Sequence, residues 1–257
     1  MEIVDTHCHL YLDEFKTDID AVIERAKKVG VKKFYLPAID SEVTDNMIAL
    51  EAAFREACFA MMGLHPCSVK ENYKEELKKV EQWLHKRSFA AVGETGLDFY
   101  WDTTFRAQQY ESFEMQMQWA LEQNSPVVIH TRNAMQEAIN SVKPFAEKGL
   151  KGIFHCFSSS YEDAKQIIDL HFLLGIGGVL TYKNSGLQTV IEKIPMEHIV
   201  LETDAPYLTP VPYRGKRNES SYLPFIIAKL AEVKKITVEE VTDITTSNAE
   251  KIFKQPS

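Results

Sequence analysis

The chain has 257 residues, a length typical of one α/β barrel. Its composition of 45% hydrophobic, 26% charged and 11% aromatic residues is that of a soluble globular protein and excludes disorder, collagen and a coiled coil. With 29 Lys and Arg against 37 Asp and Glu, the formal net charge is −8, which argues against a protein that coats nucleic acid through a broad basic surface.

No feature of the sequence indicates export, a membrane or a disulfide scaffold. No apolar run approaches the roughly 18 residues that a membrane span needs. The first ten residues, MEIVDTHCHL, lack the basic start and apolar stretch of a signal peptide. The four cysteines include no Cys-x-x-Cys pair, as expected of free thiols in a reducing compartment. We therefore expect a cytoplasmic protein without a membrane or an obligate protein partner.

Short apolar runs alternate with longer amphipathic stretches along the whole chain, without a linker or a low-complexity tract. We predict strands at the apolar runs 3–10, 34–39, 59–64, 90–93, 126–130, 152–157, 172–176 and 199–204. Helices are predicted between them at about 17–29, 42–57, 73–86, 105–123, 133–147, 161–170, 185–194 and 221–234. A further helix near 237–253 closes the chain.

The alternation predicts a single (β/α)₈ barrel that spans residues 1–257. Continuous apolar runs are typical of parallel strands, which are buried on both faces. A doubly wound open sheet is the alternative. The segment Gly175 to Gly178 is too short for a dinucleotide fingerprint, and the chain has no P-loop. The polar residues at the ends of the predicted strands favour the barrel.

Polar side chains follow most of the predicted strands, at the end where barrel enzymes carry their chemistry. Five of the eight histidines occupy such positions: His7, His9, His65, His130 and His155. Glu94 and Asp204 occupy two more. Any one of these histidines is more often structural, but burying all of them together without a metal would be costly. The remaining three, His85, His171 and His198, lie elsewhere and are interpreted as structural or solvated.

The spacing of these residues predicts a centre for two divalent metal ions. Alternation along a strand turns His7 and His9 to one face, and Asp5 shares that face and is expected to orient an imidazole. We expect one ion to bind His7, His9, Glu94 and Asp204. A second would bind Glu94, His130 and His155, with Glu94 as the bridge. Imidazoles with carboxylates suit Zn²⁺ or Mn²⁺, and suit Mg²⁺ less well.

Two ions roughly 3.5–4 Å apart lower the pKa of the water between them, so this centre predicts a hydrolase of phosphate esters, amides or lactones. Metal ligands alone do not choose among these substrates.

Several motifs together resemble the TatD family of metal-dependent deoxyribonucleases. They are Asp5-Thr-His-Cys-His-Leu10, Gly63-Leu-His-Pro66, Gly93-Glu-Thr-Gly-Leu-Asp98, His155-Cys-Phe-Ser158, Leu201-Glu-Thr-Asp-Ala-Pro-Tyr-Leu208 and Arg214-Gly-Lys-Arg-Asn-Glu219. The resemblance covers essentially the whole chain. It implies hydrolysis of DNA phosphodiesters, as a 3′→5′ exonuclease that prefers single strands. It also implies the ligand set His7, His9, Glu94, His130, His155 and Asp204. Thr95, Ser159 and Ser220 depart from the family pattern without removing a ligand.

Basic and aromatic residues beside this centre suit a nucleic-acid substrate. Three cations fall within positions 214–217, and arginine offers a fork for phosphate oxygens, so Arg214 and Arg217 are candidate substrate-binding residues. The family resemblance implies that His65 faces substrate phosphate. Tyr100 and Trp101 would either stack a base or pack their own loop, and the sequence leaves both readings open.

The expected catalytic residues are Asp204, Glu94 and His65, with Asp204 accepting a proton from the attacking water. Two alternatives remain at this stage. The same centre suits an amidohydrolase or a deacylase of the aminoacyl-tRNA type, although no lysine stands near the end of the strand at 90–93 to serve as a modified bridge. A metal-binding scaffold without turnover is the other.

Overall fold

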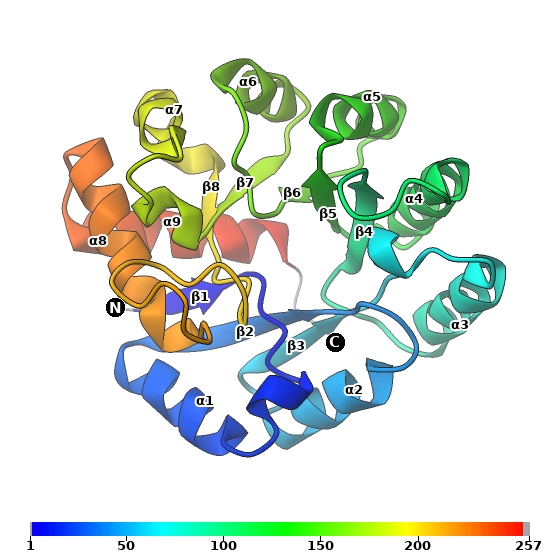
Figure 1. Cartoon of the computed structure of the whole chain (residues 1–257), viewed down its shortest axis with the longest axis horizontal. Coiled ribbons are helices and arrows are strands. Elements are labelled where there is room, and N and C mark those ends of the chain that lie inside the picture. The colour runs from blue at the N-terminus through cyan, green and yellow to red at the C-terminus, as the bar shows by residue number, and fades with distance from the viewer. Residues whose placement is uncertain (1, 254–257) are drawn as a thin grey trace.

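Eight parallel strands, each followed by a helix, make up the part of the chain that the computed structural model describes, residues 2–253 (Figure 1). The strands are β1 (Ile3–Asp5), β2 (Val31–Pro37), β3 (Cys58–Met61), β4 (Val92–Asp98), β5 (Val127–Arg132), β6 (Gly152–Phe154), β7 (Leu173–Ile176) and β8 (Ile199–Leu201). The helices are α1 (Ile19–Lys28), α2 (Thr44–Ala53), α3 (Tyr73–Lys86), α4 (Arg106–Glu122), α5 (Met135–Ala146), α6 (Tyr161–Asp169), α7 (Leu187–Lys193), α8 (Leu223–Lys234) and α9 (Val238–Ile252).

The strands close into a barrel. β1 to β3 form one parallel sheet and β4 to β8 form another, each in sequence order. Single bridges join the two sheets on both sides, at Met62 with Val92 and at Cys8 with Ala205. At the second junction the Asp204 amide donates to the His7 carbonyl at 2.9 Å. The closed (β/α)₈ barrel excludes the open-sheet alternative.

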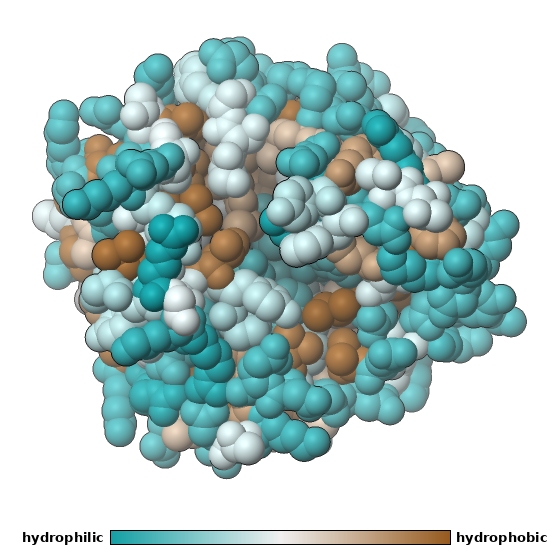
Figure 2. Space-filling view, in the orientation of Figure 1, coloured by the Kyte–Doolittle hydropathy of each residue, from teal (hydrophilic) through white to brown (hydrophobic). Residues whose placement is uncertain are grey.

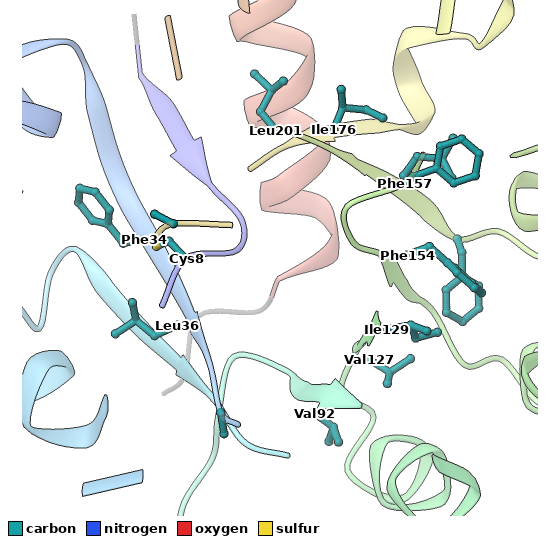
Figure 3. Packing of buried hydrophobic residues seen from close by; sticks show 14 of the residues in the cluster. Cys8, Phe34, Leu36, Val92, Val127, Ile129, Phe154, Phe157, Ile176 and Leu201 are labelled. Atoms are coloured by element: carbon teal, nitrogen blue, oxygen red, sulfur yellow. The ribbon is translucent and has the colours of Figure 1, made fainter. Parts of the chain in front are cut away.

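Alternation along each strand separates the layer under the helices from the barrel interior. Phe34 and Leu36 of β2 face the helices and are fully buried there, whereas Tyr35 between them belongs to the interior cluster (Figure 3). In β5, Ile129 faces outward and Val128 inward. The same period of two turns His130 toward the barrel axis. Apolar packing on one face therefore fixes the direction of the polar side chains on the other.

The N-terminal end of the barrel is covered by α9. Phe253, directly after this helix, stacks on Tyr35 with ring centroids 3.8 Å apart, and Ala249 joins the same interior cluster. In Figure 1, α9 passes behind the strands, so the opposite end of the barrel faces the viewer. None of the helices within residues 2–253 is long and apolar enough to cross a membrane.

The strand bounds differ from the predicted ones at the polar end. β1 ends at Asp5 and β8 at Leu201, because the following residues leave the ladder and run over the barrel rim. β4 instead continues to Asp98, beyond the predicted end at residue 93. Glu94 therefore lies inside a strand, and Glu94 and Asp98 share one face.

Candidate metal centre

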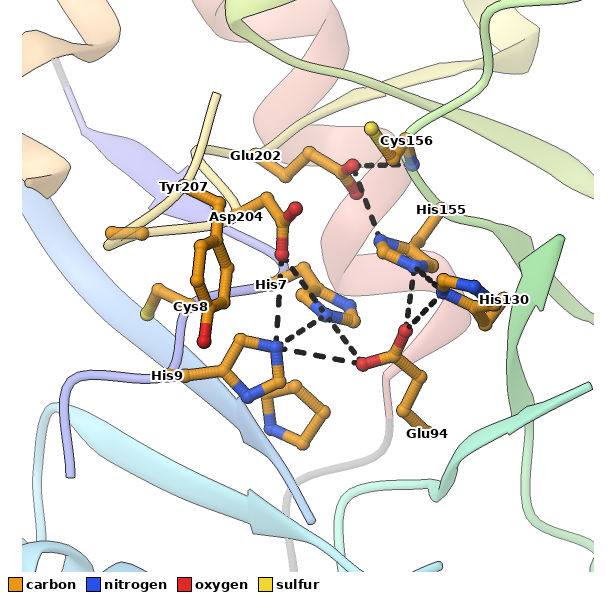
Figure 4. A network of polar contacts seen from close by, with 12 residues as sticks. His7, Cys8, His9, Glu94, His130, His155, Cys156, Glu202, Asp204 and Tyr207 are labelled. Atoms are coloured by element: carbon orange, nitrogen blue, oxygen red, sulfur yellow. Dashed lines mark hydrogen bonds and ion pairs between the residues drawn. The ribbon is translucent and has the colours of Figure 1, made fainter. Parts of the chain in front are cut away.

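The predicted ligands converge at the C-terminal end of the barrel (Figure 4). They come from the segment after β1, from β4 and β5, and from the segments after β6 and β8, and they are His7, His9, Glu94, His130, His155 and Asp204. A pocket of about 790 Å³ opens above them. Figure 2 shows the surface hollowed at the centre of this face. Residues nearly 200 positions apart in the sequence thus share one site.

The two carboxylate oxygens of Glu94 divide the surrounding imidazoles into two groups. Oε2 lies 3.1 Å from His7 Nε2 and 3.5 Å from His9 Nε2. Asp204 Oδ1 joins this first group, 3.7 Å and 3.6 Å from the same nitrogens. Oε1 lies 2.7 Å from His155 Nε2 and 2.9 Å from His130 Nδ1. Each carboxylate oxygen of Glu94 thus contacts a different pair of imidazoles.

The hydrogen-bond partners of two imidazoles leave their inward nitrogens free to bind a metal. The Tyr11 hydroxyl donates to the Pro37 carbonyl, so its oxygen accepts from His9 Nδ1, 3.0 Å away. His130 Nε2 lies 2.9 Å from Asp98 Oδ2 and donates to it. The lone pairs of His9 Nε2 and His130 Nδ1 then face Glu94. A metal-ligating histidine is held by a partner of this kind on its other nitrogen.

Glu202 lies beside the outer nitrogen of His155 without a hydrogen bond to it. This glutamate is fully buried, and its Oε1 lies 3.6 Å from His155 Nδ1 and accepts from the Cys156 amide. A Cβ at Gly175 would stand 2.1 Å from Glu202 Oε2, so glycine there makes room for the carboxylate. The buried Nδ1 atoms of His7 and His155 both lack a hydrogen-bond partner among residues 2–253.

His65 occupies the edge of the cluster and carries its proton on the nitrogen that faces Glu94. Its Nδ1 accepts the Cys67 amide proton at 3.0 Å, so the neutral ring carries its proton on Nε2. That nitrogen lies 3.4 Å from Glu94 Oε1 and 3.3 Å from His130 Nδ1. His65 is thus a hydrogen-bond donor at the pocket wall. It also lies close enough to Glu94 and His130 to reach a cation bound by those two residues.

Electrostatics keep the two central carboxylates ionised. Burial raises the pKa of Glu94, but the charges of His155, His65 and His7 outweigh it and hold that pKa well below its ordinary value. Burial likewise raises the pKa of Asp204, and its close contacts with His9 and the nearby imidazoles hold the pKa below the ordinary range. Buried anions among imidazole nitrogens suit a divalent cation.

Asp5 does not orient an imidazole, contrary to our expectation. Its carboxylate accepts from the Thr203 amide and hydroxyl at 3.0 Å and 2.7 Å, and from the Ser220 hydroxyl at 2.6 Å. Full burial, partly offset by these bonds, raises the pKa of Asp5 to about 6. Because β1 is short, the side chain binds the neighbouring segment after β8 and supports the rim.

The basic segment is divided between two environments. Arg217 forms two bonds to Asp18, at 2.8 Å and 2.7 Å, and its guanidinium stacks on Phe15. These contacts hold the predicted substrate-binding Arg217 against the start of α1, outside the pocket lining. Arg214 is exposed and lies 4.3 Å from the Tyr182 ring centroid, without an ion pair within residues 2–253. Of the two, only Arg214 has a guanidinium free for a substrate phosphate.

Sequence reasoning missed three residues of this site. Tyr11 orients His9, Glu202 lies beside His155, and Arg132 is the one Lys or Arg among the described residues that line the pocket. Arg132 follows His130 by two positions in β5, so the period of a strand was a signal that pointed to it. Tyr11 follows His9 by the same two positions, so the same signal was present there.

Comparisons with known proteins agree with this geometry. Residues 4–254 match the family model described as TatD related DNase. The chain is 35% identical to the uncharacterized metal-dependent hydrolase YabD of Bacillus subtilis, over 98% of this chain and 99% of YabD. It is 31% identical to the uncharacterized metal-dependent hydrolase YcfH of Escherichia coli, over 98% and 96% of the two chains. The crystal structure of YjjV, a TatD homologue of Escherichia coli, aligns with a TM-score of 0.93 at 29% identity and covers 99% of this chain and 98% of its own.

Proposed function

The chain belongs to the family of TatD-related DNases and is a metal-dependent hydrolase, and from this premise we propose that it cleaves DNA phosphodiester bonds as a 3′→5′ exonuclease that prefers single strands. The observation that carries the proposal is the contact of Glu94 with two pairs of histidines at the floor of a pocket that Arg132 lines without an ion pair among residues 2–253.

The donor set fits two divalent cations. His7, His9, Glu94 and Asp204 would hold one, and Glu94, His130 and His155 the other. Tyr11 and Asp98 fix two of these imidazoles, His9 and His130, in the orientation that ligation needs. When bound, such a pair lowers the pKa of water and offsets the charge of a phosphate.

The chain's own side chains supply the remaining steps. The water oxygen forms a bond to phosphorus, the bond from phosphorus to the leaving ester oxygen breaks, and Asp204 accepts the proton of the water. Asp204 is suited to this role because its side chain is 14% exposed and reaches the pocket as an anion. His65 donates from Nε2 to a phosphate oxygen, and Arg214 holds the strand by its backbone.

The acidic composition favours a substrate that enters one pocket over a duplex bound along a surface. The formal net charge is −8, and phosphate contacts dominate nucleic-acid affinity. A strand end needs few such contacts. The acidic charge therefore favours a protein that removes nucleotides from a strand end.

The direct test uses chelator-stripped protein with Mg²⁺, Mn²⁺ or Zn²⁺ restored singly. Substrates are single-stranded DNA labelled at either end, a matched duplex and RNA, with the double variant His7→Ala, His9→Ala as control. We expect a metal-dependent ladder that shortens from the 3′ end and is absent in the control. Folded, metal-loaded protein that cleaves none of these, but hydrolyses aminoacyl esters, would replace the proposal with a deacylase on the same centre.

A further inference from the structure

Two large aromatic side chains stand exposed beside the pocket. Trp101 is 68% exposed and Tyr100 is 51% exposed, directly after β4. The two rings contact each other, with centroids 4.8 Å apart, and still leave most of the Trp101 surface exposed. Trp101 also lines the pocket that contains the candidate metal ligands. Its ring is therefore both accessible and next to the reaction site.

Arg132 joins this pair. Its guanidinium lies 3.8 Å from the Tyr100 ring centroid and 4.9 Å from that of Trp101. The rings hold one planar group in place, while its edge stays free, since no carboxylate within residues 2–253 pairs with it. An arginine held in this way presents fixed donors to a phosphate.

The loop that carries the rings is anchored to the candidate metal centre. Asp98 Oδ1 accepts from the amides of Tyr100 and Trp101 at 2.9 Å and 3.2 Å, while Oδ2 contacts His130 at 2.9 Å. The Phe99 amide donates to the Arg132 carbonyl at 2.9 Å. The Asp98 carboxylate thus links the backbone of Trp101 to His130 and holds the two at a fixed separation.

We infer that Trp101 and Arg132 form the nucleotide-binding edge of the site, on which one unpaired base stacks while the arginine binds its phosphate. The inference rests on the proposed function and adds the element that selects single strands. Every base has a face that stacks on an aromatic ring, so this contact tolerates any sequence. In a duplex both faces of an internal base are already covered, and the base is unavailable to Trp101.

The test combines a variant with a changed substrate. Trp101→Ala and wild type are compared on single-stranded oligonucleotides in which one of the last three 3′ nucleotides is replaced by an abasic analogue. On the unmodified strand we expect the variant to raise KM about 10-fold, the loss typical of one stacked base, with little change in kcat. With the abasic analogue at the stacking position, the two enzymes should have the same KM.

Trp101→Phe keeps a ring and should restore most of the affinity, whereas Met115→Ala, a truncation of an exposed side chain on α4, should change nothing. A KM difference that persists with every abasic substrate, or a variant with unchanged KM, would overturn the inference and leave the nuclease intact. If wild type cleaves no oligonucleotide, the proposed function fails, and the nucleotide-binding edge fails with it.

Discussion

Which ring nitrogen of a histidine is free to bind a metal depends on the hydrogen bond that the other nitrogen makes. His9 and His130 each have an oxygen partner on the outer nitrogen, whereas His65 accepts a proton there. The sequence predicts which histidines reach the rim, because they follow apolar strands. It does not predict these partners, which come from other segments and depend on distances of a few ångströms.

Asp98 is expected to support metal binding through His130. Asp98→Asn removes the acceptor at Oδ2 or turns an amide against His130 Nε2. We expect metal affinity to fall 10–100-fold, as for other partners of ligating histidines. Titration against a chelating dye measures this, with Asp102→Asn as control, since Asp102 lies in the same loop but pairs with Lys70 at 2.8 Å. Equal affinities of the two variants would contradict this role.

Asp204 is expected to be the proton acceptor. Asp204→Asn keeps the shape of the side chain but removes its basicity, so kcat should fall at least about 100-fold. Single-turnover cleavage measures the loss, and the melting temperature shows whether the fold survives. Near wild-type turnover by a folded, metal-loaded variant would remove Asp204 from the mechanism.

At the scale of the elements, β4 shows where sequence patterns fail. The run Gly93-Glu-Thr-Gly resembles a loop, and the predicted strand stops there, yet the strand continues to Asp98. Pairing with β5 overrides the local signal, since Gly96 lies opposite His130 in the ladder. The helices are predicted better, because their apolar faces repeat over three or more turns.

Gly96 has a positive φ of 142°, and a Cβ there would meet the His130 carbonyl at 2.0 Å. Gly96→Ala therefore pushes β5 away and should reduce the free energy of unfolding by about 1–3 kcal/mol beyond the backbone strain itself. Gly149→Ala is the matched control, with φ of 97° and open space around it. Urea denaturation measures the free energy of unfolding of both variants. Equal losses would show that the close approach of β4 and β5 adds no cost to Gly96→Ala.

At the scale of the whole molecule, the first and last repeats are joined by ion pairs. Arg25 of α1 binds Glu219 at 2.9 Å and 2.6 Å, and Asp18 binds Arg217. The barrel itself follows from the sequence, because eight apolar runs alternate with helices. The direction of Arg217 does not, because a loop residue has no periodicity to show which side it faces.

These pairs predict a pH-dependent contribution to stability. Burial raises the pKa of Glu219, but Arg25, Ser221 and Arg217 outweigh it and hold the pKa below its ordinary 4.5. A lowered carboxyl pKa stabilises the fold above the ordinary value, and this stabilisation is lost as pH falls through the folded pKa. Glu219→Gln should cost about 2 kcal/mol at pH 7. Urea denaturation should show the difference shrinking below pH 4.5, and a difference independent of pH would contradict the pairing.

The central claim is that Glu94 bridges two cation sites. Its most direct test is the number of ions that chelator-stripped protein retains after titration with Mn²⁺ or Zn²⁺ and removal of excess metal. We predict about two ions per chain for wild type, the stoichiometry of a two-metal centre, and fewer for Glu94→Gln with the fold intact. Folded wild-type protein that retains one ion or none at saturation would contradict the account.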